Sequence, residues 1–347
     1  MEGPEVLYRY RPEIELEITR AVPPTGDVLD EMLRYTLGWT DDGLPRLGKC
    51  LRPSLCLLAC ESLGGDVQQA MPVAVAIELV HNFSLVHDDI EDGDETRHHR
   101  PTLWSVYGRD QAVAAGTALW TRAYETLNEA ERRGVPTERV LAARLILTEA
   151  CQQIIEGQHM DLSFETRTDV TLAEYLEMIG YKTGALYAAS LRIGALMAGA
   201  DDETIDLFGV FGQQLGLSFQ IRDDILGIWG QVTKQGFVFT FDRATGKPVG
   251  ADIARRKKSL PIVQAFQQAV GPDRELLRTV YSTPTIEDDD IDAVLDVLQR
   301  WNCRYFAQGL AEDCRSRAMS VLARVHVPME ARIRFDDLTS FILEREF

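Results

Sequence analysis

Apolar residues recur three and four positions apart along almost the whole chain, and this spacing restricts the fold more than any other feature. Residues at this spacing share one face of an α-helix, so the pattern predicts helices with one buried side. The alternation of apolar and polar residues that is typical of strands is almost absent. No linker interrupts the series, which predicts a single all-α domain over residues 1–347. The predicted helices cover residues 27–38, 50–63, 67–92, 104–133, 136–164, 171–199, 202–229, 253–269, 286–301, 304–325 and 333–345.

One segment, residues 230–250, departs from the helical pattern. It contains the run from Phe237 to Phe241, which favours a strand, followed by the turn-like sequence Asp-Arg-Ala-Thr-Gly. We interpret residues 231–245 as an insertion. Both a short hairpin and an irregular loop are compatible with it, because a two-stranded hairpin is only marginally stable alone.

The charge balance limits the partners of the chain. Lys and Arg number 36 and Asp and Glu number 54, so the formal charge is −18. A field of this sign repels polyanions, and we therefore expect neither nucleic acid nor an acidic membrane surface as a partner. A small anionic substrate would need local cations or a metal ion to offset the field.

We expect a cytoplasmic protein without a membrane span. A spanning helix needs roughly 18 apolar residues in succession, but Glu78 interrupts the apolar run 71–80 and Arg192 the run 184–200. The first residues are acidic and lack the apolar core of a secretion signal. Six cysteines without a CxxC pair indicate reduced thiols. Cys56 and Cys60 are interpreted as small buried residues of a helix rather than as metal ligands.

Two similar segments each end an apolar helix in a pair of aspartates. If the two helices face each other, their carboxylates lie across one cavity, an arrangement that attracts a divalent metal ion. Hard oxygen ligands without a nearby thiolate suit Mg²⁺. A solvated acidic helix end is the alternative for each pair taken alone. The segments are 83–92, with Asp88, Asp89 and Asp92, and 217–227, with Asp223 and Asp224 at positions 135 residues after the first pair.

Basic side chains accompany the aspartates. A diphosphate held by metal also needs direct cationic contacts, which Lys and Arg supply. Taken singly, each of these residues is typical of a surface charge. The candidates are Lys49, Arg52, Arg97, Arg100, Lys182, Lys247, Lys257 and Lys258.

The order and spacing of these residues resemble the trans-prenyl diphosphate synthases from near the N-terminus to the C-terminal helix. The motifs that carry the resemblance are G-K-x-x-R-P at 48–53, H-N-F-S-L-V-H-D-D-I-E-D at 81–92, T-R-x-x-R-P-T at 96–102, G-Q-x-x-D-L at 157–162, K-T-G-A-L at 182–186, F-Q-I-R-D-D at 219–224 and G-K-P-V-G-x-D-I-x-x-x-K-K-S-L-P at 246–261.

The resemblance implies a bundle of antiparallel helices around a deep central cavity, usually as a homodimer. It implies head-to-tail coupling of an allylic diphosphate with isopentenyl diphosphate. By the same resemblance, Asp88 and Asp92 bind two Mg²⁺ ions and Asp223 binds a third, with Asp89 and Asp224 in support. All three ions would bridge the allylic diphosphate.

The remaining roles also follow from the resemblance. Metal ions and lysines fixed in a water-poor cavity would stabilise the departing diphosphate. No protein base is evident, so the departing diphosphate would take the final proton. Arg97, Lys182, Lys247 and Lys257 would contact the allylic diphosphate, Lys49, Arg52 and His81 would hold isopentenyl diphosphate, and Thr183 and Gln220 would face the allylic cation.

Two further features concern water and product length. The insertion at 231–245 would help to close the cavity against water, which quenches an allylic cation; a neutral surface loop is the alternative. Phe83 stands five positions before Asp88 and resembles the plug of geranylgeranyl diphosphate synthases, while the small Ser84 argues against a stop at fifteen carbons. We therefore expect a twenty-carbon product, with plain core packing of Phe83 as the competing interpretation.

The chain departs from the family pattern at two positions. The second motif lacks its third carboxylate, because Gly227 stands there, and His98 replaces the second arginine after the first motif. That arginine usually contacts isopentenyl diphosphate, so affinity for this substrate is expected to be weaker. Four of the six histidines, 81, 87, 98 and 99, cluster around the first motif, but we interpret them as ordinary for the family rather than as a zinc site.

Two other functions are compatible with parts of the sequence. Gly227 and His98 favour a terpene cyclase of the same fold, but a cyclase has no need of the isopentenyl site of Lys49, Arg52 and His81. A non-catalytic partner subunit of a synthase would be expected to lose its metal-binding and lysine residues, which this chain retains.

Overall fold

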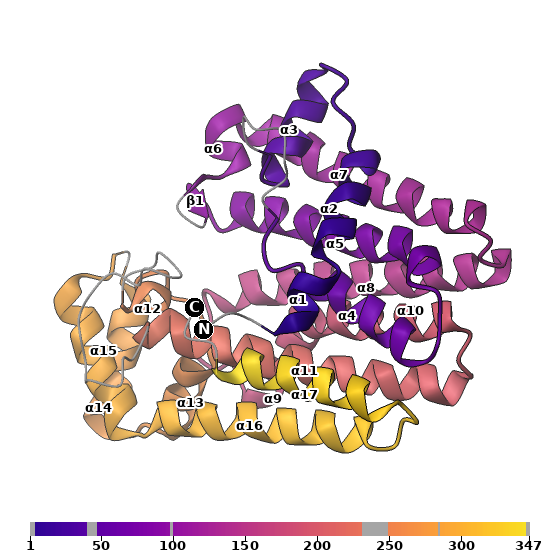
Figure 1. The fold of residues 1–347 in the computed structure, drawn as a ribbon. Coiled ribbons are helices and arrows are strands. Elements are labelled where there is room, and N and C mark those ends of the chain that lie inside the picture. Colours follow the sequence, from indigo (N-terminus) through magenta and orange to yellow (C-terminus); the bar gives the residue numbers. More distant parts are fainter. Residues whose placement is uncertain (1–3, 40–46, 98–99, 231–248, 284, 345–347) are drawn as a thin grey trace. The chain divides into compact units, whose positions relative to one another are not determined.

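A computed structural model of the protein describes residues 4–39, 47–97, 100–230, 249–283 and 285–344. Within these residues the secondary structure is mainly helical, and one short ladder pairs β1 (Thr96–Arg97) antiparallel with β2 (Arg100–Pro101) (Figure 1). The all-α prediction is confirmed. The insertion predicted over residues 231–245 lies outside the described residues.

The chain forms two compact units. Unit 1 comprises Met1–Ile154, Ala185–Gly212 and Met319–Leu338, and unit 2 comprises Ile155–Gly184, Gln213–Ala318 and Thr339–Phe347. The helices α8 (Thr137–Phe164), α11 (Asp202–Trp229), α16 (Cys303–Leu322) and α17 (Met329–Glu344) contribute residues to both units. The organisation as a single domain stays a prediction.

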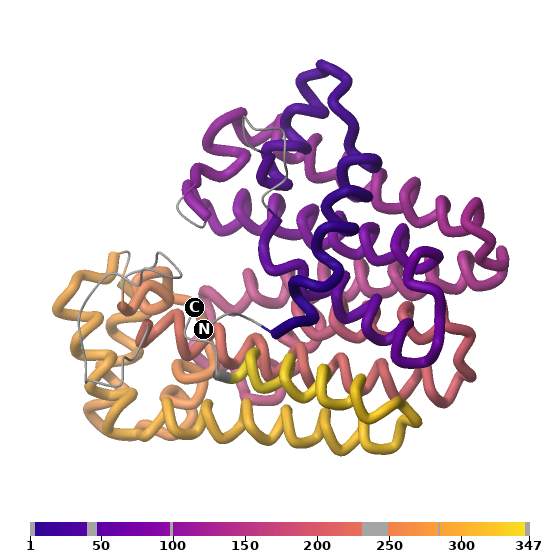
Figure 2. The backbone as a smooth tube through the Cα atoms, in the orientation of Figure 1, coloured from indigo at the N-terminus to yellow at the C-terminus, as the bar shows by residue number. Residues whose placement is uncertain are grey.

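Unit 1 is built around a long buried helix. Its further elements are α1 (Glu5–Arg9), α2 (Arg11–Ala21), α3 (Val28–Thr36), α4 (Leu51–Ser62), α5 (Val67–Glu91), α6 (Leu103–Tyr107), α7 (Arg109–Arg132) and α10 (Ala185–Ala198). Every residue of α5 from Ala70 to Val80 is buried, because α2, α4, α7 and α10 pack around the helix. The tube in Figure 2 shows α5 running beside α7. This packing fixes the direction in which α5 presents its acidic end.

The same helix is long and apolar enough to span a membrane by length and composition alone. However, 72% of its most apolar window is buried inside the structure. The core helix of a folded domain meets the same criterion, because it is apolar on all sides. Glu78, which interrupts its apolar run, is itself buried, and burial raises the pKa of its carboxyl group.

Close helix contacts in unit 1 depend on small residues. A Cβ atom at Gly194 of α10 would lie 2.2 Å from the carbonyl oxygen of Cys56 on α4, and one at Gly116 of α7 would lie 2.5 Å from the ring of His87 on α5. Cys56 and Cys60 are fully buried on α4, as predicted. The protein has six cysteines, and all are buried without a disulfide.

Unit 2 surrounds the second half of α11. Its further elements are α9 (Leu172–Ile179), the π-helical turn η1 (Gly180–Gly184), α12 (Ala251–Ala254), α13 (Leu260–Gln268), α14 (Gly271–Ser282) and α15 (Asp288–Arg300). One buried cluster joins them, with Ile221 and Ile228 of α11, Tyr175 of α9, Leu260 of α13 and Val297 of α15 among its members. The core therefore lies directly behind the second aspartate pair.

The predicted helix boundaries fail mainly where the backbone takes positive φ. The predicted helix 104–133 is split into α6 and α7 at Gly108, whose φ is 87°. The predicted helix 253–269 is split into α12 and α13, because Arg256 has a φ of 56°. Three helices, α1, α2 and α14, were not predicted; α2 contains the alternating run Ile14-Glu-Leu-Glu-Ile18, which masks its helical period.

Candidate functional site

The first aspartate motif lies at the C-terminal end of α5. Asp88 is half-buried and Asp92 is exposed, and the N–H of Asp92 donates to the carbonyl oxygen of Asp88 at 2.8 Å. A helix C-terminus carries partial negative charge, so carboxylates placed there repel it and each other. The end of α5 is therefore prepared to attract a cation.

Asp89, between these two residues, has a different task. It is buried, and its Oδ1 accepts a hydrogen bond from Nε of Arg97 at 2.7 Å and forms an ion pair with Nη2 of the same guanidinium, also at 2.7 Å. Burial raises the pKa of Asp89, although the charge of Arg97 opposes this effect. Arg97 belongs to β1, so the pair ties the segment after α5 back to the motif.

Arg52 and His81, both predicted for the isopentenyl site, lie together in unit 1. Nη1 of Arg52 is 3.1 Å from Nε2 of His81. Burial and the charges of Arg52 and Arg97 lower the pKa of His81 well below its usual value, so the imidazole is neutral and accepts this hydrogen bond. The Arg52 guanidinium also lies 4.7 Å from the ring centre of Tyr187. Lys49 is exposed just before α4.

Phe83 lies among aromatic side chains. Its ring centre is 4.9 Å from that of His87 and 6.5 Å from that of Trp120 on α7. Trp120 in turn packs edge-on against Tyr124 at 5.5 Å. The hydroxyl of Ser84 donates to the carbonyl oxygen of His81 and adds no bulk beside the ring.

Lys182 and Thr183 belong to the π-helical turn η1, and this turn packs tightly on α8. A Cβ atom at Gly157 would lie 2.3 Å from the backbone nitrogen of Lys182. One helical turn after Gly157, Asp161 accepts a hydrogen bond from Nζ of Lys182 at 2.6 Å. The charges of Lys182 and Lys257 outweigh burial and lower the pKa of Asp161, so this ammonium–carboxylate pair is ionised. Single π-helical turns are frequent at functional sites.

A chain of hydrogen bonds leads from Thr183 to the second aspartate pair. Thr183 donates to Oε1 of Gln220 at 2.7 Å, and Nε2 of Gln220 donates to Oδ1 of Asp224 at 3.0 Å. Oδ2 of Asp224 accepts from the hydroxyl of Tyr175 at 2.6 Å and from the backbone N–H of Leu260 at 2.8 Å. Asp224 is therefore fully engaged with protein donors. The neighbouring Asp223 is half-buried.

Burial raises the pKa of Asp224 to about 6, against the lowering effect of the Lys257 charge. Asp252 also contributes to the rise, since its negative charge lies nearby. This carboxylate belongs to α12, and it meets α11 at Gly227, where a Cβ atom would lie 2.2 Å from its Oδ2.

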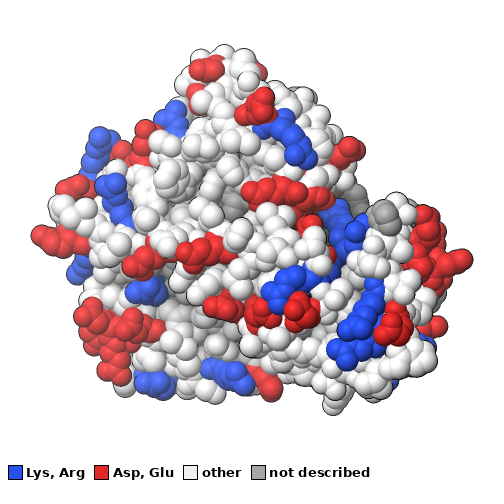
Figure 3. Space-filling model, turned by 180° about the vertical axis from the view of Figure 1, so that it is seen from behind, with Lys and Arg blue, Asp and Glu red and all other residues white. Residues whose placement is uncertain are grey.

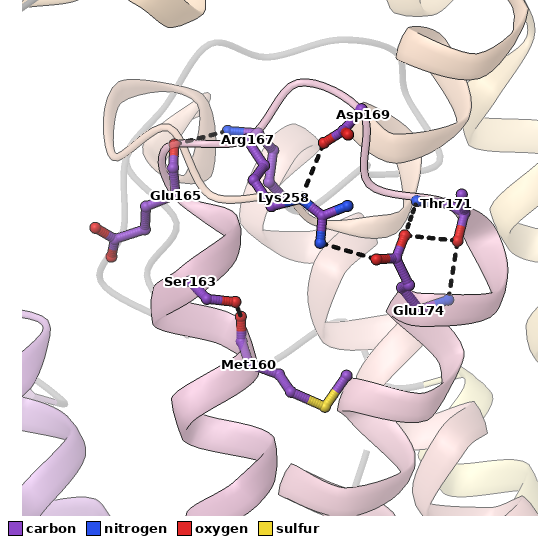
Figure 4. Close-up of polar contacts among 8 residues, drawn as sticks. All are labelled: Met160, Ser163, Glu165, Arg167, Asp169, Thr171, Glu174 and Lys258. Carbon is purple, nitrogen blue, oxygen red and sulfur yellow. Dashed lines mark hydrogen bonds and ion pairs between the residues drawn. The ribbon is translucent and has the colours of Figure 1, made fainter.

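Lys258, one of the basic candidates, has a structural role. Its Nζ donates to the carbonyl oxygens of Glu165 at 3.0 Å and Arg256 at 3.2 Å, and burial lowers its pKa to about 8. Figure 4 shows Lys258 pointing to the end of α8. Nearby, Thr171 and Glu174 form a capping box that fixes the start of α9, the helix that carries Tyr175.

Ion pairs explain how a chain with a net negative charge can still place basic side chains at a binding site. On the face seen in Figure 3, acidic and basic side chains are interspersed. Arg97 with Asp89 and Lys182 with Asp161 show the same principle at close range, because each cation is held by a carboxylate of its own unit.

Each unit thus assembles part of the predicted set. Unit 1 holds Lys49, Arg52, His81, Phe83, Asp88, Asp89, Asp92 and Arg97, and unit 2 holds Lys182, Thr183, Gln220, Asp223, Asp224 and Lys257. His98 and Lys247 lie outside the described residues. Sequence reasoning did not assign Asp161, Tyr175 or Asp252, although Asp161 and Asp252 belong to quoted motifs.

The sequence of the chain matches the model of the polyprenyl synthetase family over residues 39–298. It is 37% identical over 340 residues to (2E,6E)-farnesyl diphosphate synthase of Mycobacterium tuberculosis H37Rv, covering 95% of this chain and 90% of that protein. It is 36% identical over 326 residues to geranylgeranyl diphosphate synthase of the same strain, covering 92% and 89%.

Solved structures agree with these relatives. The polyprenyl synthetase of Streptomyces coelicolor A3(2) superposes with a TM-score of 0.86 at 37% identity, covering 97% of this chain and 98% of that one. The polyprenyl synthase of Caulobacter crescentus CB15, solved with calcium and isoprenyl diphosphate, has a TM-score of 0.84 at 25% identity and full coverage of both chains.

Proposed function

The chain belongs to the polyprenyl synthetase family, and we propose that it makes geranylgeranyl diphosphate, with magnesium, from farnesyl or a shorter allylic diphosphate and isopentenyl diphosphate. As a family member it is a prenyltransferase that elongates trans-prenyl diphosphates. The family uses isopentenyl and allylic diphosphates as substrates and divalent metal ions with them. We propose the product length and the role of each site residue.

The Arg52–His81 pair is the observation that carries the proposal. The neutral His81 accepts a hydrogen bond from Arg52, which orients the guanidinium. The ring of Tyr187 packs against the guanidinium plane. We assign Arg52 to the diphosphate of isopentenyl diphosphate together with Lys49, which is exposed just before α4. A second diphosphate site is needed for condensation and not for cyclisation. By the family resemblance, His98 completes this site.

The donor set of the chain fits magnesium. Among the described residues no three His, Cys, Asp or Glu side chains converge to enclose a metal ion by themselves. Magnesium is commonly held by one or two carboxylates together with water and substrate phosphate. Such oxygens are supplied by Asp88 and Asp92 on α5 and by Asp223 on α11. We assign two magnesium ions to Asp88 and Asp92 and a third to Asp223.

Two further aspartates position these ligands. Asp89 is occupied by Arg97, and Asp224 by Tyr175, Gln220 and Leu260. When bound, the metal ions neutralise charge that develops on the departing diphosphate. The protein's part is to hold the carboxylates still, which lowers the cost of reorganisation at the moment of reaction.

Lys182, Lys257, Arg97 and Lys247 are assigned to the allylic diphosphate. Asp161 fixes Nζ of Lys182, so this ammonium is already oriented before the substrate binds. The hydroxyl of Thr183 donates its hydrogen bond to Oε1 of Gln220, so the lone pairs of the hydroxyl oxygen can face an allylic cation. With no protein base assigned, the diphosphate that departs takes the final proton.

Product length is assigned to Phe83. Its ring is half-buried one and a half turns before Asp88, and Trp120 backs it from α7. A growing chain that runs down α5 from the first motif would meet this ring. Relatives named for farnesyl and geranylgeranyl products are equally similar to the chain, so the ring rather than the relatives supports the choice of twenty carbons.

The product assignment is tested with Phe83→Ala. We expect the wild type to stop at twenty carbons and the variant to make longer chains, read by mass spectrometry of the diphosphates. Tyr305→Ala, which removes an exposed ring on α16 that is 79% exposed, is the matched control and should leave the product unchanged. A variant that still stops at twenty carbons would leave Phe83 as a core residue only.

We also propose a homodimer that forms through α7 and the unit 1 part of α8. These helices lie side by side, since Tyr124 and Thr148 share a hydrogen bond of 2.8 Å. Leu141 and Leu145 of α8 are 56% and 60% exposed, and Trp120 of α7 is 40% exposed. Exposed apolar patches mark association surfaces. Light scattering on Leu145→Asp should then show monomer where the wild type shows dimer.

A further inference from the structure

Gly227 stands where the second acidic motif would carry its third carboxylate, one helical turn after Asp223 on α11. Residues four apart on a helix share a face, with Cβ atoms about 5–6 Å apart. A side chain at position 227 would therefore point to the same side as Asp223. Whether the motif is incomplete depends on what fills this space.

The carboxylate of Asp252 fills it. A Cβ atom at Gly227 would lie 2.2 Å from Oδ2, 2.6 Å from Cγ and 2.9 Å from Oδ1 of Asp252. Both oxygens thus occupy the place where residue 227 would begin its side chain. A larger residue at position 227 would collide with this carboxylate, so Gly227 and the position of Asp252 belong to one arrangement.

The backbone fixes Asp252 in this position. The N–H of Gly250, directly before α12, donates to the carbonyl oxygen of Ile228 on α11 at 2.9 Å. The carbonyl oxygen of Asp252 accepts from the N–H of Lys257 at 2.9 Å. The first hydrogen bond holds the start of α12 against the end of α11, and the second closes the turn after α12; neither uses the Asp252 side chain.

Asp252 is a buried residue, 4% exposed, whose side-chain oxygens make no hydrogen bond to another described residue. Its negative charge acts on Asp224 and Tyr175, so it faces the second aspartate pair. A buried carboxylate without a donor is costly unless a cation compensates it.

We propose that Asp252 supplies the third carboxylate of the second metal-binding motif and, with Asp223, provides oxygen ligands for the divalent ion of unit 2. This inference rests on the proposed function, which assigns Asp223 to that ion. The missing aspartate at position 227 is then no loss of a ligand, because a carboxylate from α12 takes its place.

The test counts bound metal rather than turnover. Mn²⁺ replaces Mg²⁺ because both prefer oxygen ligands, and electron paramagnetic resonance measures free Mn²⁺ in a titration with an alkyl bisphosphonate that cannot react. We expect Asp252→Asn to weaken the binding of one Mn²⁺ per chain by tenfold or more. Asp292→Asn, an exposed carboxylate of α15, is the control and should leave binding unchanged.

Moving the carboxylate from position 252 to position 227 distinguishes a loss of metal ligation from a loss of folding. The double variant Gly227→Asp/Asp252→Ala should recover Mn²⁺ affinity to within about threefold of wild type, whereas Gly227→Asp alone should melt at a lower temperature because two carboxylates collide. Unchanged Mn²⁺ binding in Asp252→Asn, or no recovery in a folded double variant, would overturn the role of Asp252. A wild type that binds no Mn²⁺ with the bisphosphonate would reject the proposed metal site itself, and this role with it.

Discussion

The two aspartate motifs look alike in sequence but are held in place by different forces. At the end of α5, Asp89 is fixed by one partly exposed cation, Arg97. At the second motif, Asp224 is fixed by three neutral donors: Tyr175 and Leu260 inside the core, and the half-buried Gln220. The first motif therefore depends on a charge pair that water can partly replace, and the second depends mainly on two buried hydrogen bonds, from Tyr175 and Leu260.

The largest expected effect follows from this difference. Asp224→Ala leaves the buried hydroxyl of Tyr175 and the N–H of Leu260 without an acceptor, which should cost about 3 kcal/mol or more of unfolding free energy. Asp89→Ala should cost about 1 kcal/mol or less, since the Arg97 side chain is 33% exposed and can be hydrated. Chemical denaturation of both variants measures this. Equal losses would contradict the comparison.

The next effect concerns catalysis. Lys182→Gln removes an ammonium that Asp161 orients, and it should lower kcat about 10²- to 10³-fold. The KM for isopentenyl diphosphate should stay near the wild-type value, because that substrate is assigned to the other unit. Steady-state kinetics with both substrates varied provides the readout, and Arg278→Gln, an exposed cation of α14, is the control.

Arg52→Gln should produce the opposite pattern. It removes the charged hydrogen bond that we propose Arg52 makes to isopentenyl diphosphate, worth about 1.5–3 kcal/mol, and should raise the KM for that substrate roughly ten- to hundredfold. The effect on kcat should be smaller. A fall in kcat with an unchanged KM would move Arg52 out of the isopentenyl site.

The smallest effect is a pH dependence of opposite sign in the two regions. The pKa of Asp224 is raised to about 6 in the folded state, so its contribution to stability is complete below about pH 4 and is lost as pH rises to 6. The pKa of His81 is lowered, so its contribution is present above about pH 6.5 and is lost as pH falls.

Thermal unfolding from pH 4 to 8 compares the two groups. The melting temperature of Asp224→Asn should rise relative to that of the wild type as pH increases from 4 to 6. The melting temperature of His81→Asn should rise relative to that of the wild type as pH falls below 6.5. Parallel curves for wild type and a variant would show that the substituted group does not titrate as described.

The helical period was sufficient to predict the fold class, because long amphipathic helices such as α5, α7 and α8 leave a strong pattern. It missed α2, whose Ile14 to Ile18 run alternates like a strand, and it joined α12 to α13 across Arg256. Positive φ at a residue other than glycine leaves no sign in the sequence. Such breaks depend on tertiary contacts.

Residue types and spacing identified the candidate site, but not how its members are held. Asp88 and Asp92 could be read from the helical spacing. The pair of Lys182 with Asp161 could not be read in this way, since it joins a π-helical turn to a different helix. Asp252 was hidden for the same reason. Its link to Gly227 is a contact between segments 25 residues apart, and the segment between them is mostly insertion.

The central claim is that the two regions serve one condensation, in which an allylic diphosphate is ionised and isopentenyl diphosphate attacks it. Incubation of the wild type with Mg²⁺ and farnesyl diphosphate, with and without isopentenyl diphosphate, tests this claim by mass spectrometry of the products. A twenty-carbon diphosphate that forms only when both substrates are present is the predicted result. A hydrocarbon formed from farnesyl diphosphate alone, or no turnover with any allylic diphosphate, would contradict the account.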